Sequence, residues 1–193
     1  MAWIKVIDED EADGELRELY EKYTDKISGG VDNILKIHSL NVPSLAAHYE
    51  FYKTVMRGSR DLSRIRREMI AVVVSALNHC VYWVKHHGAG LRKLTKNDAL
   101  IEKLTDNFRK AEISEAEMTM LEYAAKLTLE PWNMKETDVA ALRETGFSDE
   151  AILDINQVVG YYAFVNRLAD GLGVQLEEFW KAEKNAALQT NKL

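Results

Sequence analysis

The stretch from Glu68 to His87 constrains what this chain can fold into more than any other part of the sequence. It contains the only cysteine and three of the five histidines, around an apolar run at Ile70–Leu77. The three consecutive valines of that run suit a buried strand, but R-I-R-R-E-M leads into it without any turn signal. We therefore predict a helix. Because it is apolar on nearly every side, it should be central to the fold or covered by a partner subunit.

A break in this helix is expected at Asn78, because Asn is a preferred N-cap residue and is unfavourable inside helices. A second helix would then start near His79 and hold Cys80 in its first turn, where the positive end of the helix dipole favours a thiolate. In one straight helix, Glu68 would point roughly 120° away from Cys80. The break would let the carboxylate return to the cysteine.

In the second helix, Cys80 and His87 are seven residues apart. They share one face, because successive helical residues turn by about 100°. Trp83 lies between them on that face, so the sequence predicts that a thiol, an indole and an imidazole are neighbours. The adjacent His86 points in another direction, and we expect it to be structural or exposed to solvent.

Capping residues, glycines and prolines mark further helices along the chain. The predicted helices outside the central stretch span 13–23, 33–40, 43–57, 95–108 (capped by Thr95), 115–129 (capping box Ser114 and Glu117), a segment from a box at Asn133 and Glu136 to before Gly146, 149–170 (capped by Ser148) and 177–185. No apolar and polar alternation of period two is found, so the predicted fold is all-α. The length of 193 residues fits a single domain over 1–193.

Charge and composition exclude several classes of partner. The net charge is −6 and no basic run occurs, so the chain lacks the electrostatic footprint for nucleic acid. No apolar run approaches the ~20 residues that span a bilayer, and the acidic N-terminus does not fit a signal peptide. A single cysteine fits a reducing compartment, and we predict a cytoplasmic protein.

The spacing from Glu68 through Cys80 to His87 resembles that of the alkylhydroperoxidase D and carboxymuconolactone decarboxylase superfamily. Four segments resemble its peroxidase-related branch: L-S-R-I-R-R-E-M-I-A-V-V-V-S-A-L-N-H-C (62–80), H-H-G-A (86–89), L-R-E-T-G-F-S-D-E-A-I-L-D-I (142–155) and N-R-L-A-D-G-L-G-V (166–174). The resemblance implies a helical bundle of the alkylhydroperoxidase D type that assembles as a homo-oligomer (dimer, trimer or hexamer).

In that family a Cys-x-x-Cys pair reduces peroxides: the second cysteine attacks, the first resolves, and a glutamate and a histidine relay protons. The resemblance assigns Glu68 to the glutamate, Cys80 to the first cysteine and His87 to the histidine. Trp83 occupies the place of the second cysteine, so the chain departs from the family pattern at the attacking thiol.

The environment of the predicted catalytic residues leaves alternatives open. Glu68 either pairs with an arginine or is a buried carboxylate with a raised pKa, and the spacing favours the latter. Tyr82 and Trp83 are candidate substrate-binding residues, or simply packed aromatics. The cluster to which Asn166 belongs is either a buried polar network or a second wall of the pocket. It consists of Asn156, Tyr161, Tyr162, Asn166, Arg167 and Asp170, of which Tyr162, Asn166 and Asp170 share a face.

Three functions remain. The first is a peroxidase-like antioxidant protein of the peroxiredoxin type, in which Cys80 alone reacts with peroxide and an external thiol resolves it. The second is acid/base chemistry on a small organic acid or lactone by Glu68 and His87, as the decarboxylase branch suggests. The third is a non-catalytic member of the family. No H-E-x-x-H motif, second thiol or Gly-rich phosphate loop occurs, so neither a metal nor a cofactor is predicted.

Overall fold

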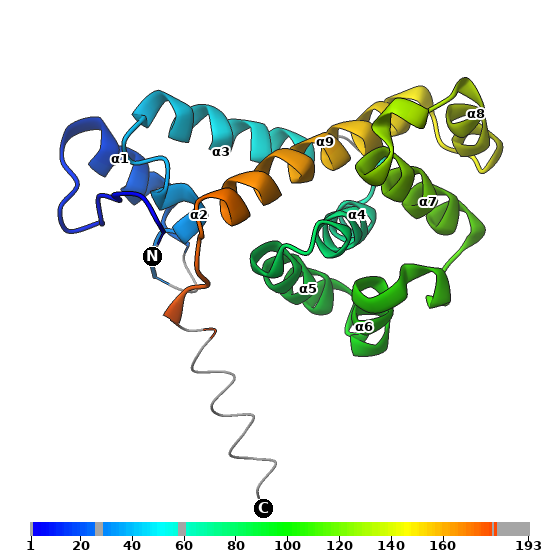
Figure 1. Cartoon of the computed structure of the whole chain (residues 1–193), viewed down its shortest axis with the longest axis horizontal. Coiled ribbons are helices and arrows are strands. Elements are labelled where there is room, and N and C mark those ends of the chain that lie inside the picture. Colours follow the sequence, from blue (N-terminus) through cyan, green and yellow to red (C-terminus); the bar gives the residue numbers. More distant parts are fainter. Residues whose placement is uncertain (1, 26–28, 58–60, 179, 181–193) are drawn as a thin grey trace, which may run out of the picture. The chain divides into compact units, whose positions relative to one another are not determined.

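The computed structural model describes residues 2–25, 29–57, 61–178 and 180, and within them the chain is entirely helical apart from turns and loops (Figure 1). The α-helices are α1 (Gly14–Tyr23), α2 (Asn33–Lys36), α3 (Val42–Arg57), α4 (Arg64–Leu77), α5 (Val81–Thr95), α6 (Asp98–Asn107), α7 (Glu115–Leu129), α8 (Glu136–Glu144) and α9 (Asp149–Gly171), with 3₁₀ turns η1 (Phe108–Lys110) and η2 (Pro131–Asn133). The prediction of an all-α fold is confirmed.

The chain divides into two compact units. The first unit is 1–50 together with 168–193, and the second is 51–167. Helices α3 and α9 each contribute residues to both. The single domain over 1–193 stays a prediction.

Helix α4 is the centre of the second unit, in contact with α5, α6 and α7 (Figure 1). Ser63 caps it, because its Oγ accepts a hydrogen bond from the backbone N–H of Arg66 at 3.3 Å. Every residue from Arg67 to Ser75 is buried. Because α4 is buried on all sides, it is apolar around nearly its whole circumference although it is a helix and not a strand. Since the single chain already buries α4, its apolar surface no longer argues for a partner subunit, and the homo-oligomer stays a prediction.

The break between α4 and α5 is confirmed, but its capping differs from the expectation. Asn78 is the C-cap of α4, and the N-cap of α5 is Cys80. His79 between them has a φ of 59°, the left-handed conformation that commonly ends a helix. The backbone N–H of Cys80 then donates to the carbonyl of Ser75 at 2.9 Å, which closes the turn. The sequence signal placed the break correctly but assigned the cap two residues too early.

Other boundaries show which capping signals are reliable. The capping box of Ser114 and Glu117 forms at the start of α7 as predicted. Thr95, expected to start a helix, is the last residue of α5, and Asn97 caps α6 instead. The box at Asn133 is also wrong. Its role is taken by Lys135, whose backbone N–H donates to the Asp138 carboxylate at 2.7 Å. Of the helix predicted over 177–185, position 179 and all from 181 onward lie outside the described residues.

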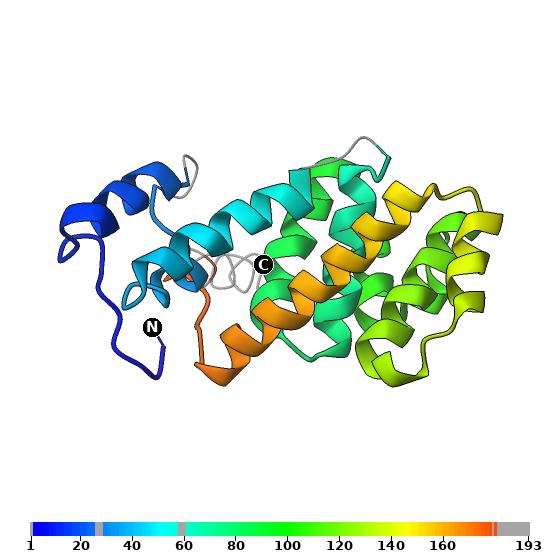
Figure 2. The ribbon, with the colours of Figure 1, turned by 90° about the horizontal axis from the view of Figure 1, so that it is seen from above.

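A buried arginine joins three helices of the second unit. The Arg67 guanidinium donates to the carbonyl oxygens of Leu62 at 3.1 Å and Val55 at 2.5 Å, and to the Asp154 carboxylate at 2.7 Å. Val55 lies near the end of α3 and Asp154 lies in α9, which runs past α4 (Figure 2). Because removing either partner of a buried ion pair leaves an uncompensated charge, Arg67 and Asp154 together fix α9 against α4.

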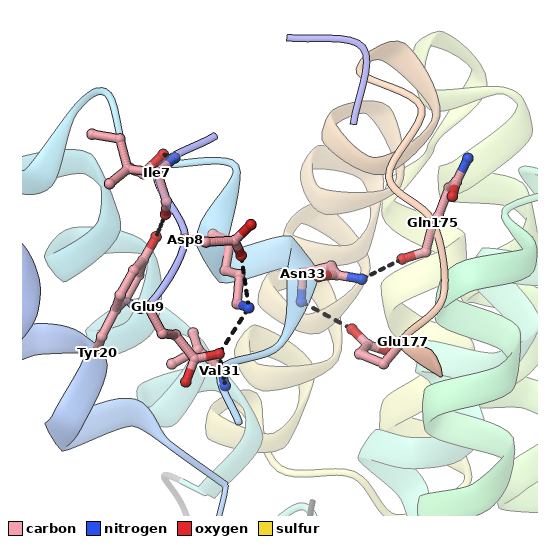
Figure 3. Close-up of polar contacts among 10 residues, drawn as sticks. Ile7, Asp8, Glu9, Tyr20, Val31, Asn33, Gln175 and Glu177 are labelled. Atoms are coloured by element: carbon pink, nitrogen blue, oxygen red, sulfur yellow. Dashed lines mark hydrogen bonds and ion pairs between the residues drawn. The ribbon is translucent and has the colours of Figure 1, made fainter. Parts of the chain in front are cut away.

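Polar contacts organise the first unit (Figure 3). The Lys36 ammonium pairs with Asp8 at 3.1 Å and Glu9 at 2.7 Å, which holds the N-terminal segment on α2. Asn33 at the start of α2 binds the segment after α9. Its side-chain amide donates to the carbonyl of Gln175 at 2.9 Å, and its backbone N–H donates to the Glu177 carboxylate at 2.9 Å.

Two buried imidazoles, His38 and His48, lie side by side in the same unit, with ring centroids 4.6 Å apart. The Nδ1 atom of His38 is 3.0 Å from the hydroxyl oxygen of Ser44. Burial lowers the pKa of both histidines, and the nearby His38 helps to lower that of His48 to about 3. Both side chains are therefore neutral in the folded protein at neutral pH.

We predict that this pair makes the protein less stable in mild acid. An unfolded His48 takes up a proton below its ordinary pKa of 6.5, whereas the folded residue does so only near 3. Stability is thus fully present above 6.5 and is lost as pH falls toward 3. Urea unfolding should give a free energy about 2 kcal/mol lower at pH 5 than at pH 7.5 from His48 alone. The loss should shrink in His48→Gln and persist in His86→Gln. An equal loss in both variants would contradict this assignment.

Candidate functional site

The candidate site is built around a hydrogen bond between the two helices that the sequence singled out. Glu68 in α4 and His87 in α5 are in direct contact, with Oε2 and Nδ1 2.5 Å apart. The exposed fractions of these residues are 1% and 5%. A carboxylate and an imidazole thus meet inside the protein rather than at its surface.

Arg64 lies one turn before Glu68 on α4 and forms an ion pair with the other oxygen of the same carboxylate. Its guanidinium lies 2.5 Å from Oε1 and also donates to the carbonyl of Met56 at 2.8 Å. Burial alone would raise the pKa of Glu68, but the charges and hydrogen bonds of His87 and Arg64 together bring it below its usual value. The expectation of a raised pKa is therefore wrong. The alternative that Glu68 pairs with an arginine is correct.

Tyr162 in α9 completes a hydrogen-bonded chain. Its hydroxyl oxygen lies 2.7 Å from Nε2 of His87, and the residue is fully buried. With the Nδ1–H of His87 donating to Glu68, Nε2 is free to accept the hydroxyl proton of Tyr162. Burial, followed by the negative charge of Glu68, raises the pKa of Tyr162 well above its usual value, so the hydroxyl stays protonated. Arg64, Glu68, His87 and Tyr162 are thus joined by one ion pair and two hydrogen bonds into a continuous chain.

Trp83 covers this chain from one side. Its ring stacks on the His87 imidazole with centroids 5.2 Å apart and an interplanar angle of 21°. The Tyr162 ring meets Trp83 edge-on at 5.8 Å. The indole N–H donates to the carbonyl of Val165 at 3.1 Å, which anchors the ring to α9. The predicted neighbourhood of Trp83 and His87 is therefore present, with the indole as a packed and hydrogen-bonded wall.

Cys80 is fully buried at the N-cap of α5. Its Sγ lies 4.0 Å from the backbone carbonyl oxygen of Asn166 in α9. This contact suits a protonated thiol, which can donate to the carbonyl, whereas the dipole of the following helix favours the thiolate. The carbonyl contact and the helix dipole therefore have opposite effects on the ionisation of Cys80, the only cysteine of the chain.

Asn166 serves mainly to hold helices together. Its side-chain amide donates to the hydroxyl of Ser75 at 3.1 Å and accepts from the amide of Asn78 at 2.9 Å. Both ends of the amide are therefore engaged by the α4–α5 junction. This is the buried network that the sequence left open as one explanation of the cluster. Substrate binding by Asn166 stays a prediction.

Tyr82 packs among the aromatic rings of α5. It meets Trp83 edge-on at 5.3 Å and stacks on His86 at 4.4 Å. The orientation of His86 away from His87 agrees with the prediction. Tyr82 therefore supports the position of Trp83, and a role in substrate binding stays a prediction.

Sequence reasoning missed Arg64 altogether and did not assign a role to Tyr162. Arg64 could have been found from its position four residues before Glu68, the spacing of a helical ion pair. Tyr162 lies four residues before Asn166 on the same face of α9, but no local pattern indicated that this face meets His87.

No group of three or more His, Cys, Asp or Glu side chains among the described residues is arranged to hold a metal ion. None of the helices in that part of the chain has the length and apolar character needed to cross a bilayer.

Comparison with known proteins identifies the family. Residues 43–129 match the carboxymuconolactone decarboxylase family. An uncharacterized peroxidase-related protein from Silicibacter sp. TM1040 has a similar structure, with 37% sequence identity over 86% of this chain and 88% of that chain, and a TM-score of 0.80. The chain belongs to the alkylhydroperoxidase D and carboxymuconolactone decarboxylase superfamily.

Two more structures extend the similarity. The alkylhydroperoxidase D core of a peroxidase-related protein from Ralstonia eutropha JMP134 is 29% identical over 91% of this chain and 92% of that chain, with a TM-score of 0.83. The debrominase Bmp8, solved in complex with 2,3,4-tribromopyrrole, shares the fold at 18% identity, with 89% and 88% of the two chains covered and a TM-score of 0.70. A search of curated proteins gave no match. The alkylhydroperoxidase D fold is thus confirmed for this member of the superfamily.

We predict that the Glu68 pairs stabilise the fold far more than surface ion pairs do. Glu68→Gln keeps the shape but removes the charge that Arg64 and His87 both contact. Breaking a buried pair on one side should lower the free energy of unfolding by about 3 kcal/mol. Glu122→Gln is the matched control, because its pair with Arg109 is on the surface. It should cost less than about 1 kcal/mol. Similar losses in urea titrations of the two variants would refute the prediction.

Proposed function

We propose that this protein is a peroxidase-related redox protein in which Cys80 reduces a small hydroperoxide. The observation that carries the proposal is the buried Glu68–His87 hydrogen bond, because the family resemblance assigns these residues to the glutamate and histidine that relay protons. The position of Cys80 at the start of α5 supports it further, since a helix N-terminus stabilises a thiolate. The 37% identity to a peroxidase-related protein is consistent with the same class of chemistry.

The reaction balances with one external reductant. The Cys80 thiolate attacks the outer oxygen of the hydroperoxide, the O–O bond breaks, and the products are a sulfenic acid and an alkoxide that takes a proton to become an alcohol. An external thiol then condenses with the sulfenic acid and releases water, and a second thiol reduces the mixed disulfide. The pair of His87 and Glu68 would take up the proton that the Cys80 thiol loses and pass it to the leaving alkoxide. This cycle requires a reducing compartment, as predicted for a cytoplasmic protein.

The surroundings of Cys80 restrict the substrate. The thiol is fully buried and faces the Asn166 carbonyl. Only a small peroxide could reach it without a large opening of the bundle, and formation of the thiolate requires loss of the contact with that carbonyl. We therefore expect hydrogen peroxide to react faster than a bulky organic hydroperoxide, and turnover to be slow.

A second function is favoured by a specific observation. The path from Glu68 through His87 to Tyr162 is complete without any thiol. General acid/base chemistry on a small organic acid, as in the decarboxylase branch of the superfamily, would need only these groups. The two functions differ in whether Cys80 changes its oxidation state.

Oxidation of Cys80 is the experiment that tests the first function. Brief exposure to hydrogen peroxide followed by trapping with a sulfenic-acid reagent and peptide mass spectrometry should label Cys80 and lower the free thiol content in parallel. In Glu68→Gln the rate should fall by roughly 10- to 100-fold, because the carboxylate that supports proton transfer through His87 is lost. Cumene hydroperoxide should react more slowly than hydrogen peroxide in the wild type.

The control is Cys80→Ser, which should abolish both labelling and peroxide consumption without changing the helical content. If folded wild type retains an unmodified thiol at peroxide concentrations that oxidise a free cysteine, the peroxidase proposal fails. The acid/base function then becomes the better explanation of the relay.

Restoring the second cysteine should restore a dithiol cycle. Trp83 is one turn after Cys80, within the ~7 Å between Cα atoms that a disulfide requires. Its ring stacks on His87, so a thiol at that position would lie next to the imidazole. Trp83→Cys should therefore form a disulfide with Cys80 on oxidation and gain peroxide turnover with dithiol reductants. Addition of Glu68→Gln should remove most of that gain.

Trp83→Ser is the matched control, because it creates the same cavity without a thiol. Both changes remove a large buried ring and should lower stability by about 3 kcal/mol or more, so folding is checked first by circular dichroism. Disulfide formation is measured by the mass change on thiol labelling before and after reduction. A folded Trp83→Cys variant that forms no disulfide would show that the pocket differs from a dithiol site by more than one residue.

A further inference from the structure

Tyr162 is held in an arrangement that suits one-electron chemistry, which the peroxide cycle of Cys80 does not use. Its hydroxyl oxygen lies 2.7 Å from Nε2 of His87, and Nδ1 of the same ring lies 2.5 Å from the Glu68 carboxylate. A phenol gives up an electron readily only if its proton leaves at the same time, because the oxidised phenol is a very strong acid. The base that takes the proton must be within hydrogen-bond reach, and His87 meets this condition.

The hydroxyl proton of Tyr162 is sealed from solvent. The residue is fully buried, and burial, followed by the negative charge of Glu68, raises its pKa well above the usual value, so the hydroxyl is protonated at rest. When Nε2 accepts this proton, the imidazole becomes a cation whose Nδ1–H already points at the Glu68 carboxylate. A charge-assisted hydrogen bond then stabilises the protonated base.

A row of aromatic rings leads from Tyr162 to the edge of α5. The Tyr162 ring meets Trp83 edge-on with centroids 5.8 Å apart, and Trp83 meets Tyr82 at 5.3 Å. Tyr82 stacks on His86, which is only half-buried. Indole and phenol rings can each lose one electron, and rings in contact pass an electron from one to the next. The row therefore connects the buried Tyr162 to an oxidant that does not enter the core.

We propose that Tyr162 is a redox-active tyrosine that gives one electron, by way of Trp83, to a small radical oxidant of the organic peroxyl class. A two-electron oxidant would have to touch the reacting atom, whereas a radical can take its electron through the rings. Phenols are general chain-breaking donors to peroxyl radicals, and this phenol has a built-in acceptor for its proton. The activity does not use Cys80 and goes beyond the proposed reduction of hydroperoxides.

One external thiol per radical completes the reaction. As its electron leaves, Tyr162 transfers its proton to Nε2 of His87, which produces a neutral tyrosyl radical beside an imidazolium. The peroxyl radical takes up the electron and a proton from water and becomes a hydroperoxide. An external thiol then returns an electron to the tyrosyl radical, and the proton moves back from His87. The thiol loses its own proton to water and becomes a thiyl radical, and two thiyl radicals couple to a disulfide.

Electron paramagnetic resonance detects the radical directly on the full chain. Oxidation by photogenerated tris(bipyridyl)ruthenium(III), followed by rapid freezing, should give a tyrosyl spectrum. At high field it should show a single lowered g value along the C–O bond, because the radical oxygen accepts a hydrogen bond from His87. Preparation in D₂O should change the coupling to that exchangeable proton. Surface tyrosines would instead give a spread of g values from varied hydration.

Two neighbouring tyrosines provide the matched pair of variants. Tyr162→Phe should abolish the component with the lowered g value. Tyr161→Phe is the control, because Tyr161 is the adjacent residue of α9 and is equally buried, but the ring nitrogens of His87 are bonded to Glu68 and Tyr162. It should leave that component in place.

Two tryptophans test the route of the electron. Trp83→Phe keeps an aromatic ring but removes the readily oxidised indole, and it should lower the yield of the Tyr162 radical severalfold. Trp132→Phe is its control, because Trp132 is 81% exposed and lies in η2, outside the row of rings. It should not lower the yield.

The oxidant class is tested with peroxyl radicals from a water-soluble azo initiator. With glutathione as reductant, small amounts of the protein should delay the bleaching of fluorescein for longer than glutathione alone does. Tyr162→Phe should lose most of this delay, and Tyr161→Phe should keep it. The delay should also be found in Cys80→Ser, in which peroxide reduction is abolished, so the two activities fail independently.

A hydrogen-bonded tyrosyl radical that disappears in Tyr162→Phe and persists in Tyr161→Phe supports the proposal. Its persistence in Tyr162→Phe, an equal loss in both variants, an absence of coupling to an exchangeable proton or equal effects of the two tryptophan changes would each overturn it. A protein that gives no delay with the azo initiator would overturn the peroxyl class. Circular dichroism checks each variant first. If Tyr162→Phe does not fold, the D₂O measurement on wild type and the tryptophan pair still decide.

Discussion

A buried carboxylate held between an arginine and a histidine sets the architecture of the second unit. A charge as deeply buried as that of Glu68 is tolerated only when its oxygens are fully paired. One oxygen is matched by Arg64 on the same helix, and the other by His87 on the next. The pairing with Arg64 is local to α4. The pairing with His87 requires α5 to fold back against α4 so that His87 lies beside Glu68. The break at His79 and Cys80 provides the reversal that makes this possible.

The close approach of α5 to α4 also explains a glycine within α5. A Cβ atom at Gly90 would lie 3.3–3.4 Å from the carboxylate atoms of Glu68. Glu68 cannot easily retreat, because its two oxygens are held from opposite sides. A glycine inside a helix costs about 1 kcal/mol relative to alanine, and here it leaves room for the buried carboxylate. The Glu68 carboxylate therefore also restricts the side chain at position 90, three residues after its partner His87.

Local signals in the sequence identified most of this arrangement. The apolar run of α4, the break before α5 and the shared face of Trp83 and His87 all follow from helical periodicity and flanking residues. What could not be foreseen is the contribution of α9. The contacts of Tyr162 with His87 and of Asp154 with Arg67 each span more than seventy residues, and such contacts leave no periodic trace. The prediction of a raised pKa for Glu68 was wrong for a related reason. The apolar neighbours in the sequence indicated burial, which raises the pKa, but the pairing with His87 and Arg64 that lowers it depends on distances in the folded structure.

Helix α9 contributes to the candidate site although it lies outside the family match. The match to the family covers residues 43–129 and thus contains Glu68, Cys80, Trp83 and His87, but not α9. Yet α9 supplies the hydroxyl on His87 Nε2, the carbonyl that anchors the Trp83 indole and the carbonyl that faces the Cys80 sulfur. His87, Trp83 and Cys80 therefore each have a partner on α9, outside the family match, whereas Glu68 is paired within it. Trp83 stands where the family resemblance places a second cysteine, and α9 offers its indole N–H an acceptor. The hydrogen bonds that join Glu68, His87 and Tyr162 therefore form without a thiol at position 83, and the residues of α9 determine what packs against His87 and Cys80.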